Sequence, residues 1–170
     1  DGIVGITNDI YYDSNKIYIS TQSGLMVGEE AFPEIDVTGN NVSILNEDNT
    51  PSTLDDTSFG FATAAVIKTF TISNSLGSAD LLLTDNASNY VTISGSADFT
   101  ISTQPNGGTI GKGASKTFRV TYTPNLVGDQ TATISIANND SDENPFTFTI
   151  SGNKANYSNY TTTYEPQVYN

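Results

Sequence analysis

The sequence predicts an all-β protein in which two antiparallel sheets pack as a sandwich with Greek-key connections. Three observations indicate this class. Short segments alternate apolar and hydroxyl side chains with a period of two, which is the spacing of a strand with one buried face. Clusters of Gly, Asn, Ser and Pro separate these segments. No long stretch has the periodicity of an amphipathic helix, and many short strands with such punctuation are typical of a sandwich.

Four segments carry the clearest alternation. In residues 116–124, Phe118, Val120 and Tyr122 alternate with Thr and Arg side chains, which predicts one buried and one wet face. The same pattern occurs in residues 68–73, 131–137 and 145–151. Weaker strands are expected at residues 33–39, 59–63, 80–85, 90–94 and 98–102, with turns at 39–41, 74–78, 105–108 and 111–113.

Composition excludes several kinds of chemistry. The 170-residue chain has a net charge of −13 and only six basic residues, so neither nucleic acid nor an anionic membrane surface is an expected partner. It contains no His and no Cys, which excludes a Ser-His-Asp triad, a typical zinc site and disulfides. No apolar run approaches the length of a membrane helix, so membrane insertion is not expected. These features suit an extracellular protein without enzymatic activity or an obligatory cofactor.

The acidic residues in the loops do not indicate an enzyme either. Glu47, Asp48, Asp55 and Asp56 lie within residues 46–56, where we expect a solvated surface loop. Paired carboxylates can hydrolyse glycosides, but that chemistry needs a cleft with aromatic sugar platforms, and the chain has no Trp.

The two ends differ from the middle and contain seven of the nine tyrosines. Residues 1–32 and 153–170 are therefore expected to be strand-forming extensions on either side of a domain at 33–152. They could donate strands to another copy, add strands to their own domain, or continue into neighbouring domains of a longer chain. Alternation places apolar side chains on one face of each extension, and these are the candidate assembly residues: Val4, Ile6, Ile10 and Tyr12 at the N-terminal side, and Tyr160, Tyr164 and Val168 at the C-terminal side. Pro166 restricts the second segment to the edge of a sheet.

The central part resembles a known family of modules. Its marks are PEIDVTGNNVSI, SFGFATAAVIKTFTISNSLGSADLLLT, FTISTQP and GKGASKTFRVTYTPNLVGDQTATISIANNDSDENPFTFTISG. Together they resemble the choice-of-anchor D domain, an Ig-like module similar to the hydin-type domains. The resemblance covers about residues 33–152. It implies an Ig-like β-sandwich in a secreted or surface-attached bacterial protein, and it implies no catalytic residues.

The segment NNDSDENP at residues 138–145 has two interpretations. Asp140, Asp142 and Glu143 could supply carboxylate ligands to Ca²⁺, although the spacing lacks the glycine and distal Glu of an EF-hand loop. The alternative is a hairpin connection, because Asn and Asp bond to their own backbone in turns and Pro145 can begin an edge strand. The connection is the favoured interpretation, and calcium binding is kept as a hypothesis.

These observations predict a structural protein that binds copies of itself. An exposed sheet edge can accept a strand from another molecule, and a donated strand at one terminus makes a head-to-tail contact that propagates into a filament. We therefore expect a subunit of a bacterial surface filament assembled by β-strand donation. The alternative is an adhesion module that binds glycans, with or without Ca²⁺, and that is a fragment of a larger secreted protein.

Overall fold

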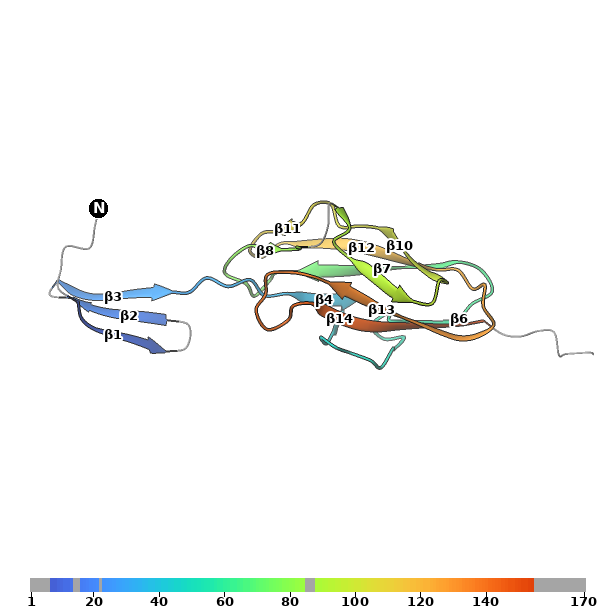
Figure 1. The fold of residues 1–170 in the computed structure, drawn as a ribbon, viewed down its shortest axis with the longest axis horizontal. Coiled ribbons are helices and arrows are strands. Elements are labelled where there is room, and N and C mark those ends of the chain that lie inside the picture. Colours follow the sequence, from blue (N-terminus) through green and yellow to red (C-terminus); the bar gives the residue numbers. More distant parts are fainter. Residues whose placement is uncertain (1–6, 14–15, 22, 85–87, 155–170) are drawn as a thin grey trace, which may run out of the picture.

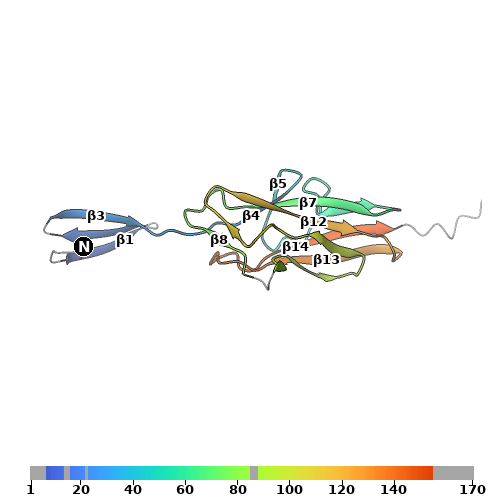
Figure 2. The ribbon, with the colours of Figure 1, turned by 90° about the horizontal axis from the view of Figure 1, so that it is seen from above.

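The computed structural model describes residues 7–13, 16–21, 23–84 and 88–154. These residues form a two-sheet sandwich and a separate three-stranded sheet on the N-terminal side of it, joined by an extended linker (Figure 1). Figure 2 shows the same separation from a perpendicular direction. The prediction of an all-β sandwich is confirmed.

The first sheet of the sandwich contains the strands with the most regular alternation. Its five members are β4 (Asp36–Gly39), β5 (Val42–Ile44), β7 (Val66–Ser73), β10 (Phe99–Thr103) and β12 (Ser115–Tyr122). They lie in the order β10–β12–β7–β4–β5, and every pairing is antiparallel. The long β7 and β12 pair in register over eight positions, so their apolar residues form one continuous inner face.

The second sheet contains β6 (Ser58–Phe61), β9 (Thr92–Gly95), β13 (Gly128–Ile136) and β14 (Phe146–Lys154) in the order β6–β14–β13–β9. The β13–β14 hairpin pairs over nine positions and is antiparallel, whereas β6 pairs with β14 in parallel. The segment around β6 covers the outer edge of β14 along its length through backbone hydrogen bonds. At one end, Glu47 N–H donates to the carbonyl of residue 147 (2.7 Å), and at the other, Ala62 N–H donates to the carbonyl of residue 153 (2.9 Å).

Two very short strands were not predicted, β5 and Thr109–Ile110 (β11). The latter pairs with Leu81–Leu82 (β8), which lies within the strand expected at residues 80–85. Two or three residues are too few to display a period, and these strands form because their neighbours in the fold offer free backbone groups.

The core lies between the two sheets and is built from inward-facing residues of both. Tyr122 stacks on Phe99 with ring centroids 4.7 Å apart, and Phe59 meets the same two rings edge to face. Phe70 stacks on Phe118 at 5.3 Å. Gly152 is required beside this cluster, because a Cβ there would lie 2.6 Å from Cε1 of Tyr122. Burial of these large side chains, at roughly 1.5–3 kcal/mol each, is the main source of stability.

Asn74 fixes the point where the linker enters the sandwich. Its fully buried side chain accepts a hydrogen bond from Glu34 N–H (3.0 Å) and donates to the carbonyls of Ala79 (2.8 Å) and Ile110 (3.0 Å). The carbonyl of Phe32 accepts bonds from two backbone N–H groups of residues 78–79. The chain enters at this end of the sandwich and leaves β14 at the opposite end (Figure 1).

The N-terminal extension forms a sheet of its own. Its strands are β1 (Thr7–Asp13), β2 (Lys16–Thr21) and β3 (Gly24–Glu29), paired antiparallel in chain order. Strand formation in this extension is as predicted, but it produces three strands rather than one donor strand. The part of the chain that the structure describes contains no helix with the length and apolarity needed to cross a bilayer.

Candidate functional site

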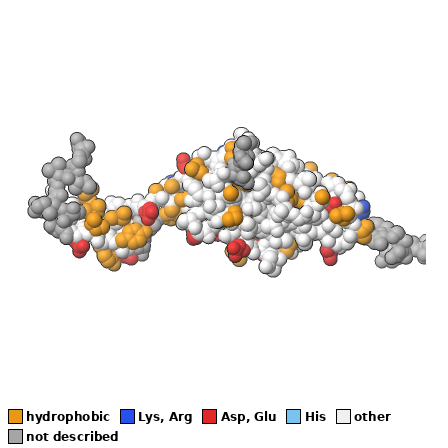
Figure 3. All heavy atoms as spheres, viewed as in Figure 1, with side chains coloured by type: hydrophobic (Ala, Val, Ile, Leu, Met, Phe, Trp, Pro, Cys, Tyr) orange, Lys and Arg blue, Asp and Glu red, His pale blue; other side chains and the backbone are white. Residues whose placement is uncertain are grey.

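In the described part of the chain, the N-terminal sheet carries the densest group of exposed apolar side chains. Ile10 and Tyr12, two of the predicted assembly residues, lie on the same face and are 64% and 58% exposed. Ile17 and Met26 continue this face on β2 and β3, as the register places them opposite residues 12 and 19. Figure 3 shows hydrophobic side chains gathered over the N-terminal sheet. We call this surface the Ile10 face (Ile10, Tyr12, Ile17, Ile19 and Met26).

The opposite side of the same sheet is apolar as well. Tyr11 on β1 lies beside Tyr18 on β2, with ring centroids 6.1 Å apart, and Val27 of β3 is the next partner in that row. Leu25 is 63% exposed on this side. We call this surface the Tyr11 face (Tyr11, Tyr18, Leu25 and Val27). The Tyr11 face was not predicted from the sequence, because Leu25, Met26 and Val27 on β3 are consecutive apolar residues and show no alternation.

The other predicted assembly residues lie outside the described residues. These are Val4 and Ile6 at the N-terminal side and Tyr160, Tyr164 and Val168 at the C-terminal side.

The loop between β13 and β14 is held by its own side chains. Asn138 is buried and donates to the carbonyls of Ile136 (3.0 Å) and Glu143 (2.9 Å), and its Oδ1 accepts a bond from Asp140 N–H (2.7 Å). Asp140 is also buried, and its carboxylate accepts a bond from Ile35 N–H (2.9 Å). The loop is therefore a hydrogen-bonded hairpin connection that also fastens the entry of β4.

This loop and the linker create an acidic end of the sandwich, defined by Glu34, Asp140, Asp142 and Glu143. Loss of solvation raises the pKa of Glu34, Asp140 and Glu143, and repulsion from neighbouring carboxylates raises it further. In the described ranges no three His, Cys, Asp or Glu side chains are grouped so that they could hold a metal ion. Calcium binding by Asp140, Asp142 and Glu143 thus stays a prediction without a preformed ligand set.

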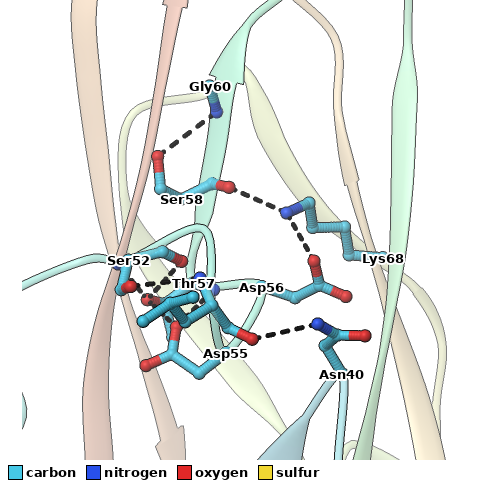
Figure 4. Close-up of polar contacts among 9 residues, drawn as sticks. Asn40, Ser52, Asp55, Asp56, Thr57, Ser58, Gly60 and Lys68 are labelled. Carbon is cyan, nitrogen blue, oxygen red and sulfur yellow. Dashed lines mark hydrogen bonds and ion pairs between the residues drawn. The ribbon is translucent and has the colours of Figure 1, made fainter. Parts of the chain in front are cut away.

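A polar groove crosses the outer side of β4 and β7. It has a volume of about 520 Å³ and is lined by threonines, by Asn40 and Asn41, and by the ion pair between Lys68 and Asp56. The Lys68 ammonium lies 2.7 Å from Oδ1 of Asp56 and donates to the carbonyl of Ser58 at 2.8 Å (Figure 4). It also lies 5.3 Å from the centre of the Phe59 ring, so three neighbours stabilise its positive charge.

The acids of residues 46–56 are not all solvated, and that prediction is wrong for one of them. Asp55 is buried, and its carboxylate accepts bonds from the backbone N–H (3.0 Å) and hydroxyl (2.6 Å) of Thr57. Asp98, another buried acid, accepts bonds from the N–H groups of Asn125 (3.0 Å) and Leu126 (2.9 Å). The carboxylates of Asp55 and Asp98 therefore each stabilise a loop by accepting hydrogen bonds from its backbone N–H groups.

This architecture defines an Ig-like sandwich with loop-capping acids and an added apolar sheet. Comparison with protein families identifies it further. The sequence pattern of the HYDIN/CFA65/VesB-like Ig-like domain family matches residues 53–153, more than half of the chain. The chain belongs to this family, and the hydin-like part of the predicted resemblance is confirmed.

Three solved structures are similar to this chain at low sequence identity. A protein of unknown function from Porphyromonas gingivalis W83 is 14% identical, with a TM-score of 0.53 over 81% of this chain and 62% of that one. The Vibrio cholerae VesB protease is 15% identical, with a TM-score of 0.44 over 66% of this chain and 31% of the protease. A PapD-like domain of human CEP192 is 13% identical, with a TM-score of 0.42 over 75% of this chain and 89% of that domain. The chain thus spans less than two thirds of the first two proteins. Among curated protein sequences, none matches.

Proposed function

We propose that this chain is a non-enzymatic extracellular structural protein whose copies assemble head to tail into a surface filament by β-strand donation. The observation that carries the proposal is the N-terminal sheet, which presents apolar side chains to solvent and, on the outer side of β3, an edge that pairs with no other strand of the described residues. The chain leaves the sandwich at the end opposite this sheet (Figure 2). A donor segment that follows β14 therefore reaches the N-terminal sheet of the next copy, which is a heterologous contact that propagates.

The acceptor in this proposal is an edge and not a groove in the sandwich core. The outer edge of β14 is already covered by backbone bonds from residues 47–62. Of the two edges of the N-terminal sheet, β1 carries Asp9 and Asp13 and a register shift, which are features that discourage pairing. On β3, Glu29 is the last residue and the others are uncharged. The proposed pair is β3 with residues 157–168 of a second copy.

The non-enzymatic part of the proposal is supported by the use of the buried acids. Asp55, Asp98 and Asp140 each accept hydrogen bonds from backbone N–H groups of loops, so their charge serves the fold. The extracellular part is supported by the net charge of −13. The proposal also includes the narrower assignment of this domain to the choice-of-anchor D modules of bacterial surface proteins.

Truncation tests strand donation directly. The full chain is compared with a chain that stops at Lys154 and with a chain in which residues 157–168 are scrambled at constant composition. Light scattering and negative-stain imaging are expected to show longer assemblies for the full chain than for the other two chains. A synthetic peptide of residues 155–170 is expected to bind the truncated chain. Filaments of equal length from all three chains would refute strand donation.

The polar groove favours a second candidate, an adhesion module that binds glycans. Its amides, threonine hydroxyls and Lys68–Asp56 pair are groups that bond to sugar hydroxyls. This candidate predicts a monomer whose glycan binding is lost in Lys68→Met. Calorimetry with Ca²⁺, with Asp142→Asn as the control variant, tests whether a cation takes part.

A further inference from the structure

The N-terminal sheet has the composition of a layer that is covered on both sides. Its register aligns three apolar rows across the strands. Two belong to the Ile10 face, and the row between them, Tyr11–Tyr18–Val27, belongs to the Tyr11 face. Consecutive apolar residues on a strand are typical of sheets that are buried on both faces, whereas a sheet with one wet face alternates.

Among the described residues, the sandwich of the same copy offers no matching surface. Its outer faces carry the off-beat positions of β7, β12, β13 and β14, which are mostly Thr and Ser. Seven of the described large apolar side chains that are exposed belong to the three short strands β1–β3, and the others are spread over the linker and the sandwich. The seven are Ile10, Tyr11, Tyr12, Ile17, Leu25, Met26 and Val27. Of the surfaces that the structure describes, the best complement to this sheet is the same sheet in another copy.

The rim of the sheet fits such a contact. Lys16 pairs with Glu29 at 3.1 Å at one end of β2 and β3, and the hydroxyl of Tyr12 bonds to Glu30 at 3.3 Å. Polar groups therefore lie at the border and apolar groups at the centre, which is the usual composition of a protein interface. Gly28 has open space around its Cα on the Ile10 face, so a partner backbone can approach there closely.

We propose that the N-terminal sheet is the middle layer of a stack, with each face packed against the same face of another copy. A contact between two Ile10 faces and a contact between two Tyr11 faces are each two-fold symmetric. Because every copy has both faces, alternation of the two contacts gives an open series of sheets about 10 Å apart. The stack rests on the proposed function only in taking a second copy as the partner. It adds contacts between sheet faces to an assembly that the proposed function attributes to the edge of β3.

Face-specific variants, made in the chain that stops at Lys154 and in the full chain for comparison, test the stack. Tyr11→Lys with Val27→Lys removes the Tyr11 face, and Ile17→Lys with Met26→Lys removes the Ile10 face. In the chain that stops at Lys154, light scattering is expected to show oligomers larger than dimers. Either paired variant is expected to stop at dimers, and the fourfold variant is expected to be monomeric.

Three controls keep the result interpretable. Leu45→Lys with Leu76→Lys changes two exposed sandwich residues and is expected to leave assembly unchanged. Thr in place of each Lys keeps strand propensity and is expected to weaken the same contacts, which separates lost packing from a misfolded sheet. The unfolding temperature of the sandwich is expected to stay constant.

The two proposals fail differently. If the truncated chain is a monomer at about 0.1 mM while the full chain polymerises, the stack is refuted and strand donation stands. If truncation changes nothing and the face variants dissociate, the stack stands and strand donation is refuted. Unchanged oligomers in every face variant also refute the stack.

Discussion

The substitution Asn74→Asp tests whether the linker anchor depends on the amide group. The native side chain accepts one bond from Glu34 N–H and donates two bonds, to the carbonyls of Ala79 and Ile110. A carboxylate of the same shape can still accept from Glu34. It would face the other two carbonyls with a negative charge and no donor.

The expected cost follows from these contacts. Two lost hydrogen bonds amount to about 2 kcal/mol, at roughly 1 kcal/mol each. Burial and the two carbonyls raise the pKa of the introduced carboxyl above its unfolded value near 3.9. A shift of about two units alone costs about 2.7 kcal/mol at pH 7. We therefore expect a loss of about 3–5 kcal/mol at pH 7, comparable to Asn74→Ala. A drop of about 10–15 °C in unfolding temperature corresponds to this loss in a domain of this size.

The pH dependence separates the two variants. Because the pKa of the introduced carboxyl is raised in the folded state, its penalty is present above that pKa and falls as pH drops towards 4. Urea unfolding at pH 7, 5.5 and 4.5 is expected to show the deficit of Asn74→Asp relative to the native chain shrinking, while that of Asn74→Ala stays constant. Equal stability of Asn74→Asp and the native chain at pH 7, or a deficit that grows in acid, would refute the reasoning.

Three further predictions concern the core and the loops. Tyr122→Phe removes a buried hydroxyl that has no hydrogen-bond partner, so urea unfolding should show a change between zero and a gain of about 1 kcal/mol; Gly152→Ala, whose new Cβ would meet the same ring, should lose at least about 2 kcal/mol. Asp98→Ala leaves two loop N–H groups without acceptors and should cost about 3 kcal/mol, with faster proteolysis at residues 123–128 and no change in the core. The raised pKa values at the acidic end mean that the native chain gains stability as pH falls from 7 towards 4.5, and a calorimetric scan should show a smaller gain in Glu143→Gln.

The regular part of the fold could be predicted because its sequence repeats the geometry of the strand. Phe118, Val120 and Tyr122 point inward as the alternation predicts, and each is fully buried. The parallel pairing of β6 with β14 could not be predicted, because the two strands are far apart in the sequence and parallel pairing leaves no local turn signal. The burial of Asp55 was missed as well: its hydrogen bonds to Thr57 are local, but the turn is covered by segments that are distant in the sequence, such as the one around Gly39.

The candidate site was predicted in part. Ile10 and Tyr12 were found because they share a parity, whereas Leu25 and Val27 were missed because Met26 between them is also apolar. A run such as LMV gives no period, and its meaning depends on what covers each side of the strand. The hairpin interpretation of residues 138–145 succeeded because Asn and Asp bond locally, so the sequence contains both partners.

The opposite positions of chain entry and exit determine how the sandwich responds to pulling. Tension applied through the linker and through the segment after Lys154 acts along β4 and β14. The hydrogen bonds that join these strands to β7 and β13 are then loaded together in shear, and not peeled one after another. We therefore expect a sandwich with this geometry to yield at a higher force than one whose strands are peeled apart, and to transmit load with little extension.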